Sequence, residues 1–326
     1  MGTLILSIGA IILGITGLVW GADRFVASSA SFARTVGISP LVIGLTIVSV
    51  GTSAPEIVVS INASLSNSGE LAIGNALGSN LANIGLVLGI TLLIAPIPVL
   101  RHLIRQESPV LLTITALAGL CLYDGVLSRL EGVALILLAI PLLVMVVKYK
   151  KSHPEDVQNE NITTYPNKQA ALLFIIGLAV LLISADIAVW GASSVAAFLG
   201  ISELVIGLTV IAIGTSLPEL AASVTSALRG HHDIALGNII GSNLFNILLV
   251  MGIAGSIQPI SLGETIFYRD YLAMAFVTLV MVGLLVWALR GSKDKATLSR
   301  TAGLILLSLY CTYNYILWLT SLPSAV

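Results

Sequence analysis

Long apolar stretches recur along the whole chain, and they constrain the fold more than any other feature of the sequence. The hydrocarbon core of a bilayer is about 30 Å thick, so a helix that crosses it needs roughly 20 apolar residues. Of the 326 residues, 57% are hydrophobic and only 10% are charged, which leaves too little polar surface for a water-soluble domain. We therefore expect an all-α membrane protein with about ten transmembrane helices. The approximate predicted spans are 3–22, 39–66, 70–97, 108–123, 127–147, 169–195, 203–228, 233–256, 268–289 and 299–320.

One polar segment, residues 148–168, divides the chain near its middle. We expect a first five-helix repeat over 1–147, a linker over 148–168 and a second five-helix repeat over 169–326. The halves align without a gap from Gly44 and from Gly207, and about half of the paired positions are identical. Because each half has an odd number of spans, the second half must enter the membrane from the opposite side. Inverted repeats of this kind are typical of secondary transporters, whose substrate site lies near the bilayer midplane.

Lysine and arginine are distributed very unevenly between the two sides of the predicted bundle. One side has only Arg129 and Arg269, and the other side carries Arg24, Arg34, Arg101, Arg105, Lys148, Lys150, Lys151, Lys168, Arg229, Arg290, Lys293, Lys295 and Arg300. Because basic residues favour the cytoplasmic side, both termini are predicted to lie outside and the 148–168 linker in the cytoplasm. The linker is too short for a sizeable regulatory domain, which is typical of a prokaryotic plasma (inner) membrane.

Two glutamates lie well inside predicted spans. Glu56 and Glu219 occupy equivalent positions in the strings GTSAPE and GTSLPE. A carboxylate at the centre of a membrane helix costs about 2.5 to 3.5 kcal/mol on insertion scales. A fold that carries this cost twice, at equivalent positions, is expected to use both carboxylates. The alternative is that each is a protonated glutamic acid that joins two helices by a hydrogen bond.

A proline precedes each of these glutamates directly. Pro55 and Pro218 have no N–H and clash with the carbonyl four residues back, so the carbonyl oxygens of Gly51 and Gly214 are expected to be free. Polar backbone at membrane depth is tolerated where it is buried in protein or lines a cavity. A packing kink would explain the proline and the glycine, but not the adjoining Thr, Ser and Glu. The pattern therefore predicts a broken helix that offers oxygen ligands to a cation.

Hydroxyl and amide side chains recur at a spacing of four residues, which places them on one face of a helix. The pairs are Thr52 with Glu56, Thr215 with Glu219, Ser79 with Asn83, and Ser242 with Asn246. Glycines four residues apart in GNALGSN and GNIIGSN let the helices approach closely. The candidate ligands are all oxygen atoms, without Cys or His. This favours hard cations over zinc or copper, and calcium or sodium over magnesium.

The strings GTSxPE and GNxxGSNxxN, present twice in inverted copies, resemble the sodium/calcium exchangers of the calcium/cation antiporter superfamily. The resemblance spans nearly the whole chain. It implies ten helices, a central site formed by the second, third, seventh and eighth helices, and two long helices, the first and sixth, that slide across it. It also implies a secondary active antiporter that exchanges sodium for calcium by alternating access and needs no cofactor.

The resemblance also assigns roles to individual residues. Glu56 and Glu219 would be the calcium ligands, with Thr52 and Thr215 beside them. The flanking sodium sites would be formed by the side chains of Ser53, Ser216, Ser79, Ser242, Asn83 and Asn246 and by backbone carbonyls near Ser49 and Ala212. Some members of the superfamily have Asp at the position of Asn246. The amide here removes one carboxylate, which weakens the case for potassium co-transport.

Three other functions are compatible with parts of this pattern. A calcium/proton antiporter would use the same glutamates, although the surrounding Asn, Ser and Thr favour sodium. An intramembrane enzyme is disfavoured because no HExxH or GxSxG motif lies in a span. A sensor that binds calcium without transporting it would share the ligands. The expected partners are therefore membrane lipid and calcium and sodium ions, with no nucleic acid and no enzyme activity.

Two further polar features lie outside this pattern. Asp23 and Asp186 are related by the repeat and lie near the ends of predicted spans, where we expect a helix cap or an Arg partner. His231 and His232 abut Arg229 in a short predicted turn, where we expect solvated side chains.

Overall fold

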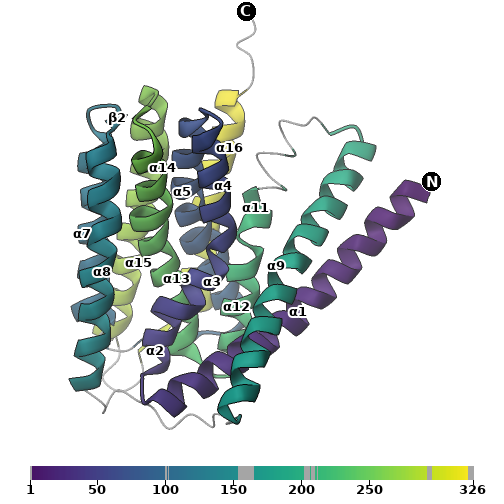
Figure 1. Ribbon diagram of the computed structural model, residues 1–326, viewed down its shortest axis with the longest axis vertical. Coiled ribbons are helices and arrows are strands. Elements are labelled where there is room, and N and C mark those ends of the chain that lie inside the picture. Colours follow the sequence, from purple (N-terminus) through teal and green to yellow (C-terminus); the bar gives the residue numbers. More distant parts are fainter. Residues whose placement is uncertain are drawn as a thin grey trace, which may run out of the picture.

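The computed structural model describes residues 2–99, 101, 103–152, 165–201, 206, 210, 212–291 and 296–321. Across these ranges the chain forms ten helical stretches that run between the two ends of the molecule (Figure 1). The greater part of the predicted linker and the beginning of the predicted seventh span lie outside the described residues.

The helical stretches of the two halves correspond in order. The first five are α1 (Gly2–Val36); α2 (Pro40–Ile43), η1 (Gly44–Val48), α3 (Ser49–Thr52) and α4 (Ala54–Leu65); α5 (Gly69–Ala82), η2 (Asn83–Leu88) and α6 (Gly89–Ile94); η3 (Leu103–Glu107) and α7 (Ser108–Leu122); and α8 (Arg129–Ser152). The next five are α9 (Asn167–Phe198); α11 (Ala212–Thr215) and α12 (Leu217–Leu228); α13 (His232–Phe245), η6 (Asn246–Met251) and α14 (Gly252–Ile257); η7 (Ile266–Tyr271) and α15 (Leu272–Gly291); and α16 (Arg300–Ser321). Each η segment is a short piece of π-helix inside a longer helix, a feature that is frequent at functional sites.

The two halves are inverted with respect to each other. In Figure 1, α1 runs from the upper end of the molecule to the lower end, whereas α9, at the same place in the second half, runs from the lower end to the upper. Two short antiparallel ribbons join the halves, because β1 (Ile97–Pro98) pairs with β4 (Thr297–Leu298) and β2 (Val126–Leu127) pairs with β3 (Ile260–Ser261). The predicted fold class, an all-α membrane protein of inverted five-helix repeats, is confirmed.

The third and eighth helical stretches form the centre of the bundle. In the most apolar window of His232–Ile257, 94% of the residues are buried, and in that of Gly69–Ile94, 78% are buried. The corresponding value for Thr3–Val36 is only 22%. An apolar helix that is exposed within its own protein needs lipid around it, so the outer helices face the membrane and the central pair carries the core. Asn80 and Asn243, both almost fully buried, join this pair, since Asn80 Nδ2 donates to the carbonyl of Asn243 at 3.2 Å.

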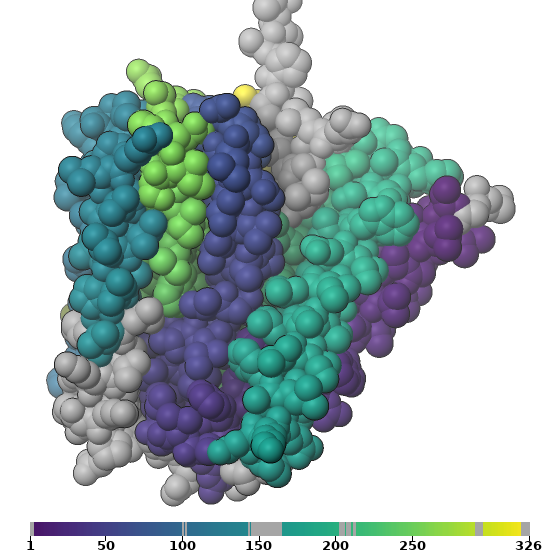
Figure 2. Space-filling view, in the orientation of Figure 1, coloured from purple at the N-terminus to yellow at the C-terminus, as the bar shows by residue number. Residues whose placement is uncertain are grey.

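The first and sixth helical stretches, α1 and α9, pack against each other at one side of the molecule (Figures 1 and 2). Small residues allow this close approach, because a Cβ added at Gly21 would lie only 2.7 Å from the backbone nitrogen of Leu181. The rings of Phe25 and Phe174 extend the contact, with centroids 5.0 Å apart. The two long helices that the family resemblance implies are therefore present as a packed pair.

The prediction that the first span ends at residue 22 is wrong, since α1 continues to Val36. The polar residue Asp23 suggested a membrane boundary, but it lies inside the helix and is paired with Arg229, whose Nε donates to Asp23 Oδ1 at 2.9 Å. The expectation of an Arg partner for Asp23 is confirmed. The expectation that His231 is solvated is wrong, because the residue is only 6% exposed, directly before α13.

Candidate ion-binding site

The second and seventh helical stretches are broken at equivalent places. The axis bends by 45° between Pro40–Thr52 and Ala54–Leu65, and Ser53 at the break has φ −82° and ψ 8°. Ser216, between α11 and α12, has nearly the same conformation, with φ −92° and ψ 3°. Each break lies two residues before a proline, as the pattern predicts, because proline is tolerated only in the first turn of a new helix.

Glu56 and Glu219 lie in the first turn of the helix that follows each break, and each side chain is only 1% exposed. The positive end of the helix dipole favours a carboxylate at this place. The sequences Ser53-x-x-Glu56 and Ser216-x-x-Glu219 match the capping-box pattern, in which serine and glutamate bind the backbone of their own helix. Neither serine makes such a bond. These polar side chains are therefore available to bind across the helix interface.

The carboxylates are instead held by serines of other helices. Ser53 Oγ donates to Glu219 Oε1 at 3.2 Å, which joins the first half of the chain to the second. Ser79 Oγ donates to Glu56 Oε1 at 3.5 Å, from the third helix to the second. Each glutamate thus has one oxygen fixed by a hydroxyl group.

Several buried polar atoms of the predicted ligands have no hydrogen-bond partner among the described residues. They are Glu56 Oε2, Glu219 Oε2, Ser216 Oγ, Ser242 Oγ and the side-chain amide atoms of Asn83 and Asn246. Buried polar groups are almost always paired, so unpaired atoms on these predicted ligands are a feature to be explained. Carboxylate, amide and hydroxyl oxygens together suit a hard cation. No group of three or more His, Cys, Asp or Glu residues lies together in the described part of the chain, so the neutral oxygens are needed to complete a coordination shell.

The remaining predicted ligands differ between the two repeats. Thr52 is fully buried, and its hydroxyl donates to Asn238 Oδ1 at 3.1 Å. The Ser49 carbonyl already accepts from the Ser53 N–H at 2.9 Å. In the second repeat the Ser216 N–H donates to the Ile213 carbonyl at 3.1 Å instead, so the Ala212 carbonyl does not receive this bond. Thr215 is partly buried at the end of α11.

Asn83 and Asn246 each mark the start of a π-helical segment, η2 and η6. A π-helical turn shifts the register of all following side chains, which alters the direction in which a ligand at its first position points. The sequence carries no signal for these turns, since both segments are as apolar as the helices around them.

Two functional candidates, Asn75 and Asn238, are missing from the sequence-based set. Asn75 Nδ2 donates to the Glu56 carbonyl at 3.1 Å, and Asn238 Nδ2 donates to the Glu219 carbonyl at 3.4 Å. Extending the four-residue spacing one turn back from Ser79 and Ser242 would have identified both.

Close contacts join α13 to the second helical stretch. A Cβ added at Gly241 would lie 2.5 Å from Ser49 Oγ, and one added at Gly237 would lie 2.7 Å from the Leu41 carbonyl. The predicted close approach of the small-residue helices therefore holds for α13 against α2 and α3.

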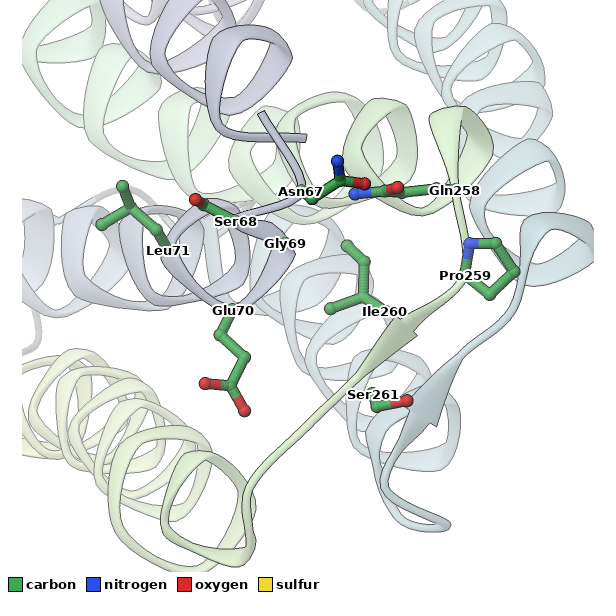
Figure 3. A pocket seen from close by; sticks show the side chains of 9 residues that line it. All are labelled: Asn67, Ser68, Gly69, Glu70, Leu71, Gln258, Pro259, Ile260 and Ser261. Carbon is green, nitrogen blue, oxygen red and sulfur yellow. The ribbon is translucent and has the colours of Figure 1, made fainter. Parts of the chain in front are cut away.

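A cavity of about 610 Å³ lies at the turn between α4 and α5, away from the glutamates (Figure 3). It is lined by Asn67, Ser68, Gly69, Glu70, Leu71, Gln258, Pro259, Ile260 and Ser261. The carboxylate of Glu70 points away from Asn67 and Gln258 in Figure 3 and accepts a hydrogen bond from the Gly263 N–H at 2.8 Å. None of the predicted site residues lines this cavity, and its one carboxylate is occupied by the backbone.

Comparison with known proteins assigns the chain to a family. The family described as sodium/calcium exchanger protein matches residues 6–148 and 169–319. The chain is 44% identical to the putative antiporter CaxA of Alkalimonas amylolytica, over 94% of this chain and 97% of that protein. It is 39% identical to the inner membrane protein YrbG of Escherichia coli, strain K12, over 98% and 97% of the two chains.

A solved structure has the same overall fold. The sodium-calcium exchanger NCX_Mj, soaked with zero Na⁺ and Ca²⁺, superposes with a TM-score of 0.82 at 33% sequence identity, over 96% of this chain and 99% of that chain. Since the family match covers most of both repeats and the relatives match over nearly their whole length, this chain belongs to the sodium/calcium exchanger family.

Proposed function

We propose that the chain is a secondary active antiporter that exchanges sodium for calcium by alternating access, with both ions bound at a midplane site that contains Glu56 and Glu219. Membership of the exchanger family and the likeness to NCX_Mj, which is named as a sodium-calcium exchanger, support calcium and sodium as the transported ions. The proposal treats the chain as a transporter and not as an enzyme.

One observation carries the assignment of the site. Glu56 and Glu219 are buried at equivalent helix breaks, each has one oxygen held by a serine, and each has the other oxygen without a described partner. Two carboxylates, together with the unpaired hydroxyl and amide oxygens of the other predicted ligands, match the charge and the ligand type that calcium requires. Thr52, Thr215, Ser53, Ser216, Ser79, Ser242, Asn83 and Asn246, with the carbonyls near Ser49 and Ala212, would complete the calcium and sodium shells.

The charge of the two glutamates accounts for obligatory exchange. Two bare carboxylates in a closed, low-dielectric site carry a large desolvation cost, several kcal/mol for each ion. One calcium ion or several sodium ions would neutralise them. The empty carrier would then be unable to change its access, and the gradient of one ion would drive the other uphill.

A calcium/proton antiporter is the nearest alternative, because protons could neutralise the same carboxylates. The unpaired oxygens of Asn83, Asn246, Ser216 and Ser242 favour sodium, since a protonated carboxyl group has no need of additional oxygen ligands. Sodium, in contrast, needs several oxygens to replace its hydration shell.

The placement in the membrane is also a proposal. The basic residues favour an orientation with both termini outside and the 148–168 linker in the cytoplasm, between repeats at 1–147 and 169–326. The short linker favours a prokaryotic plasma membrane. α1 begins and α16 ends toward the same end of the molecule in Figure 1, as this orientation requires. Membrane lipid would be the principal partner.

Uptake of calcium-45 into proteoliposomes tests the counter-ion. Vesicles loaded with sodium would be compared with vesicles loaded with potassium and with acid-loaded vesicles. Uptake only with internal sodium is expected. Uptake driven equally well by internal acid would mean that protons, and not sodium, are the counter-ion. If none of these gradients drove uptake, calcium transport itself would be contradicted.

A further inference from the structure

Asn238 makes three hydrogen bonds at the junction of three helices. Its Nδ2 donates to the Glu219 carbonyl at 3.4 Å and to Ser223 Oγ at 3.0 Å, and its Oδ1 accepts from the Thr52 hydroxyl at 3.1 Å. The side chain is fully buried. One amide group therefore binds the first turn of α12 and, through Thr52, the end of α3 in the other repeat.

Asn75 makes the equivalent donor contacts in the first repeat. Its Nδ2 donates to the Glu56 carbonyl at 3.1 Å and to Ser60 Oγ at 3.5 Å. In both repeats the amide thus contacts the glutamate and the serine four residues later, which lie one turn apart on the same helix face. This two-point contact fixes the rotation of the turn from which each carboxylate projects.

The orientation of the Asn238 amide follows from its neighbours. The Glu219 carbonyl can only accept a hydrogen bond, so the NH₂ group must face it. The carbonyl oxygen of the amide then faces Thr52 and lies 3.1 Å from its hydroxyl, closer than the other acceptor, the Ser49 carbonyl at 3.3 Å. A hydroxyl group that ligates a cation must direct its proton away from the ion, and Asn238 offers Thr52 the nearer acceptor for that proton.

We propose that Asn75 and Asn238 are positioning residues, which set the spacing of the ligand oxygens of Glu56, Glu219 and Thr52 and thereby the size of cation that the site prefers. The inference rests on the proposed function of the glutamate pair. A site whose ligands are held from behind resists expansion around a larger ion, whereas a site that has lost this support adapts to it.

Transport of calcium and strontium by Asn238→Leu and Asn75→Leu tests the proposal. Leucine keeps the branched shape of asparagine and its number of heavy atoms but removes every side-chain hydrogen bond. The expected result is an increase of about tenfold in the half-saturating calcium concentration, as when a group that orients a metal ligand is lost. The preference for calcium is expected to shift toward strontium, because strontium is the larger ion.

Ser223→Ala is the matched control. It removes one partner of Asn238 but leaves the bonds to Glu219 and Thr52 intact, so the ratio of calcium to strontium affinity is expected to stay as in the wild type. A purely structural role of Asn238 would reduce the amount of folded protein without changing this ratio. If Asn238→Leu prevents folding, Asn75→Leu still tests the proposal. Asn75 is only partly buried, so its replacement disturbs the packing less.

Transport by the wild-type protein separates a failure of the proposed antiport function from a failure of the positioning role. If the wild type transports calcium in exchange for sodium and both Asn variants keep its affinity and its calcium preference, the positioning role is wrong and the proposed function stands. If the wild type itself shows no such transport, the proposed function fails first.

Discussion

Ser53 Oγ donates a hydrogen bond to Glu219 Oε1 at 3.2 Å, from the helix break of the first repeat to the glutamate of the second. The inverted repeats are therefore joined at the site itself and not only through their apolar surfaces. Any movement that separates the two broken helices must break this bond or carry both groups together. A bound cation between the remaining oxygens would strengthen the same junction.

Replacement of Ser53 by alanine tests this junction. Glu219 would lose the hydroxyl donor to Oε1 and the proposed sodium site would lose one oxygen, so we expect the half-saturating sodium concentration to rise by about tenfold. The sodium dependence of calcium-45 uptake measures this concentration. Ser29→Ala is a suitable control, because Ser29 is also buried but, within the described part of the chain, its hydroxyl donates to the carbonyl of Phe25 in its own helix. Equal effects at both positions would contradict a specific role of Ser53.

The close contact of α13 with α2 and η1 predicts that an alanine at Gly237 destabilises the protein. A Cβ at Gly237 would meet the Leu41 carbonyl at 2.7 Å and the Gly44 Cα at 3.1 Å, and these backbone atoms have little freedom to move. Gly237→Ala is expected to destabilise the protein by about 1 to 3 kcal/mol, the usual cost of overpacking. Thermal unfolding in detergent measures the change.

Gly9→Ala is the control for that experiment. Gly9 is exposed on α1, and a Cβ there meets no described atom within 4 Å. The unfolding temperature of this variant is expected to stay the same or to rise slightly, because alanine is favoured over glycine inside a helix. A fall as large as that of Gly237→Ala would show that the close contact at Gly237 is not the cause of the destabilisation.

The sequence predicts those features of the fold and the site that depend on residues close together in the chain. The repeat, the ten spans and the broken helices at Pro55 and Pro218 follow from hydropathy and from the chemistry of proline. The length of α1 does not, because Asp23 reads as a boundary until its partner Arg229, distant in sequence, is known. For the same reason the role of Asn238 depends on Thr52 in the other repeat.

The π-helical segments had no signal at all in the sequence. Asn83 and Asn246 lie within two of the predicted spans, but their place at the start of η2 and η6 depends on packing in the bundle. The capping-box pattern at Ser53 predicts a hydrogen bond to the backbone of its own helix, but the hydroxyl donates to Glu219 instead. Predictions from local sequence patterns are therefore least accurate at the candidate site.

The Asp23–Arg229 ion pair predicts a small, salt-dependent effect. Both side chains are about one-third exposed, so water screens the interaction, and exposed pairs contribute about 0.2 to 1 kcal/mol. Asp23→Asn is expected to lower the unfolding temperature slightly at low salt and not at high salt. Asp186→Asn, at the equivalent but exposed position of α9, is expected to have no such effect. A salt-independent loss in Asp23→Asn would mean that the pair acts through packing instead.

A third carboxylate at position 246 is expected to change how calcium uptake depends on sodium. Asn246 is fully buried, and an ionised Asp there would need an additional cation for neutrality. Asn246→Asp is expected to make calcium uptake depend more steeply on sodium. Asn62→Asp, at an exposed position of α4, introduces the same charge outside the site and serves as the control. An unchanged sodium dependence in Asn246→Asp would place Asn246 outside the ion path.

The most direct test of the central claim is the initial rate of sodium-driven calcium-45 uptake by Glu56→Gln and Glu219→Gln, each normalised to the amount of folded protein in the vesicles. Glutamine keeps the shape of the side chain and one oxygen but removes the charge. If the two glutamates form one shared ion site, each variant alone loses calcium uptake while the wild type retains it. Full calcium uptake by either variant would contradict the account.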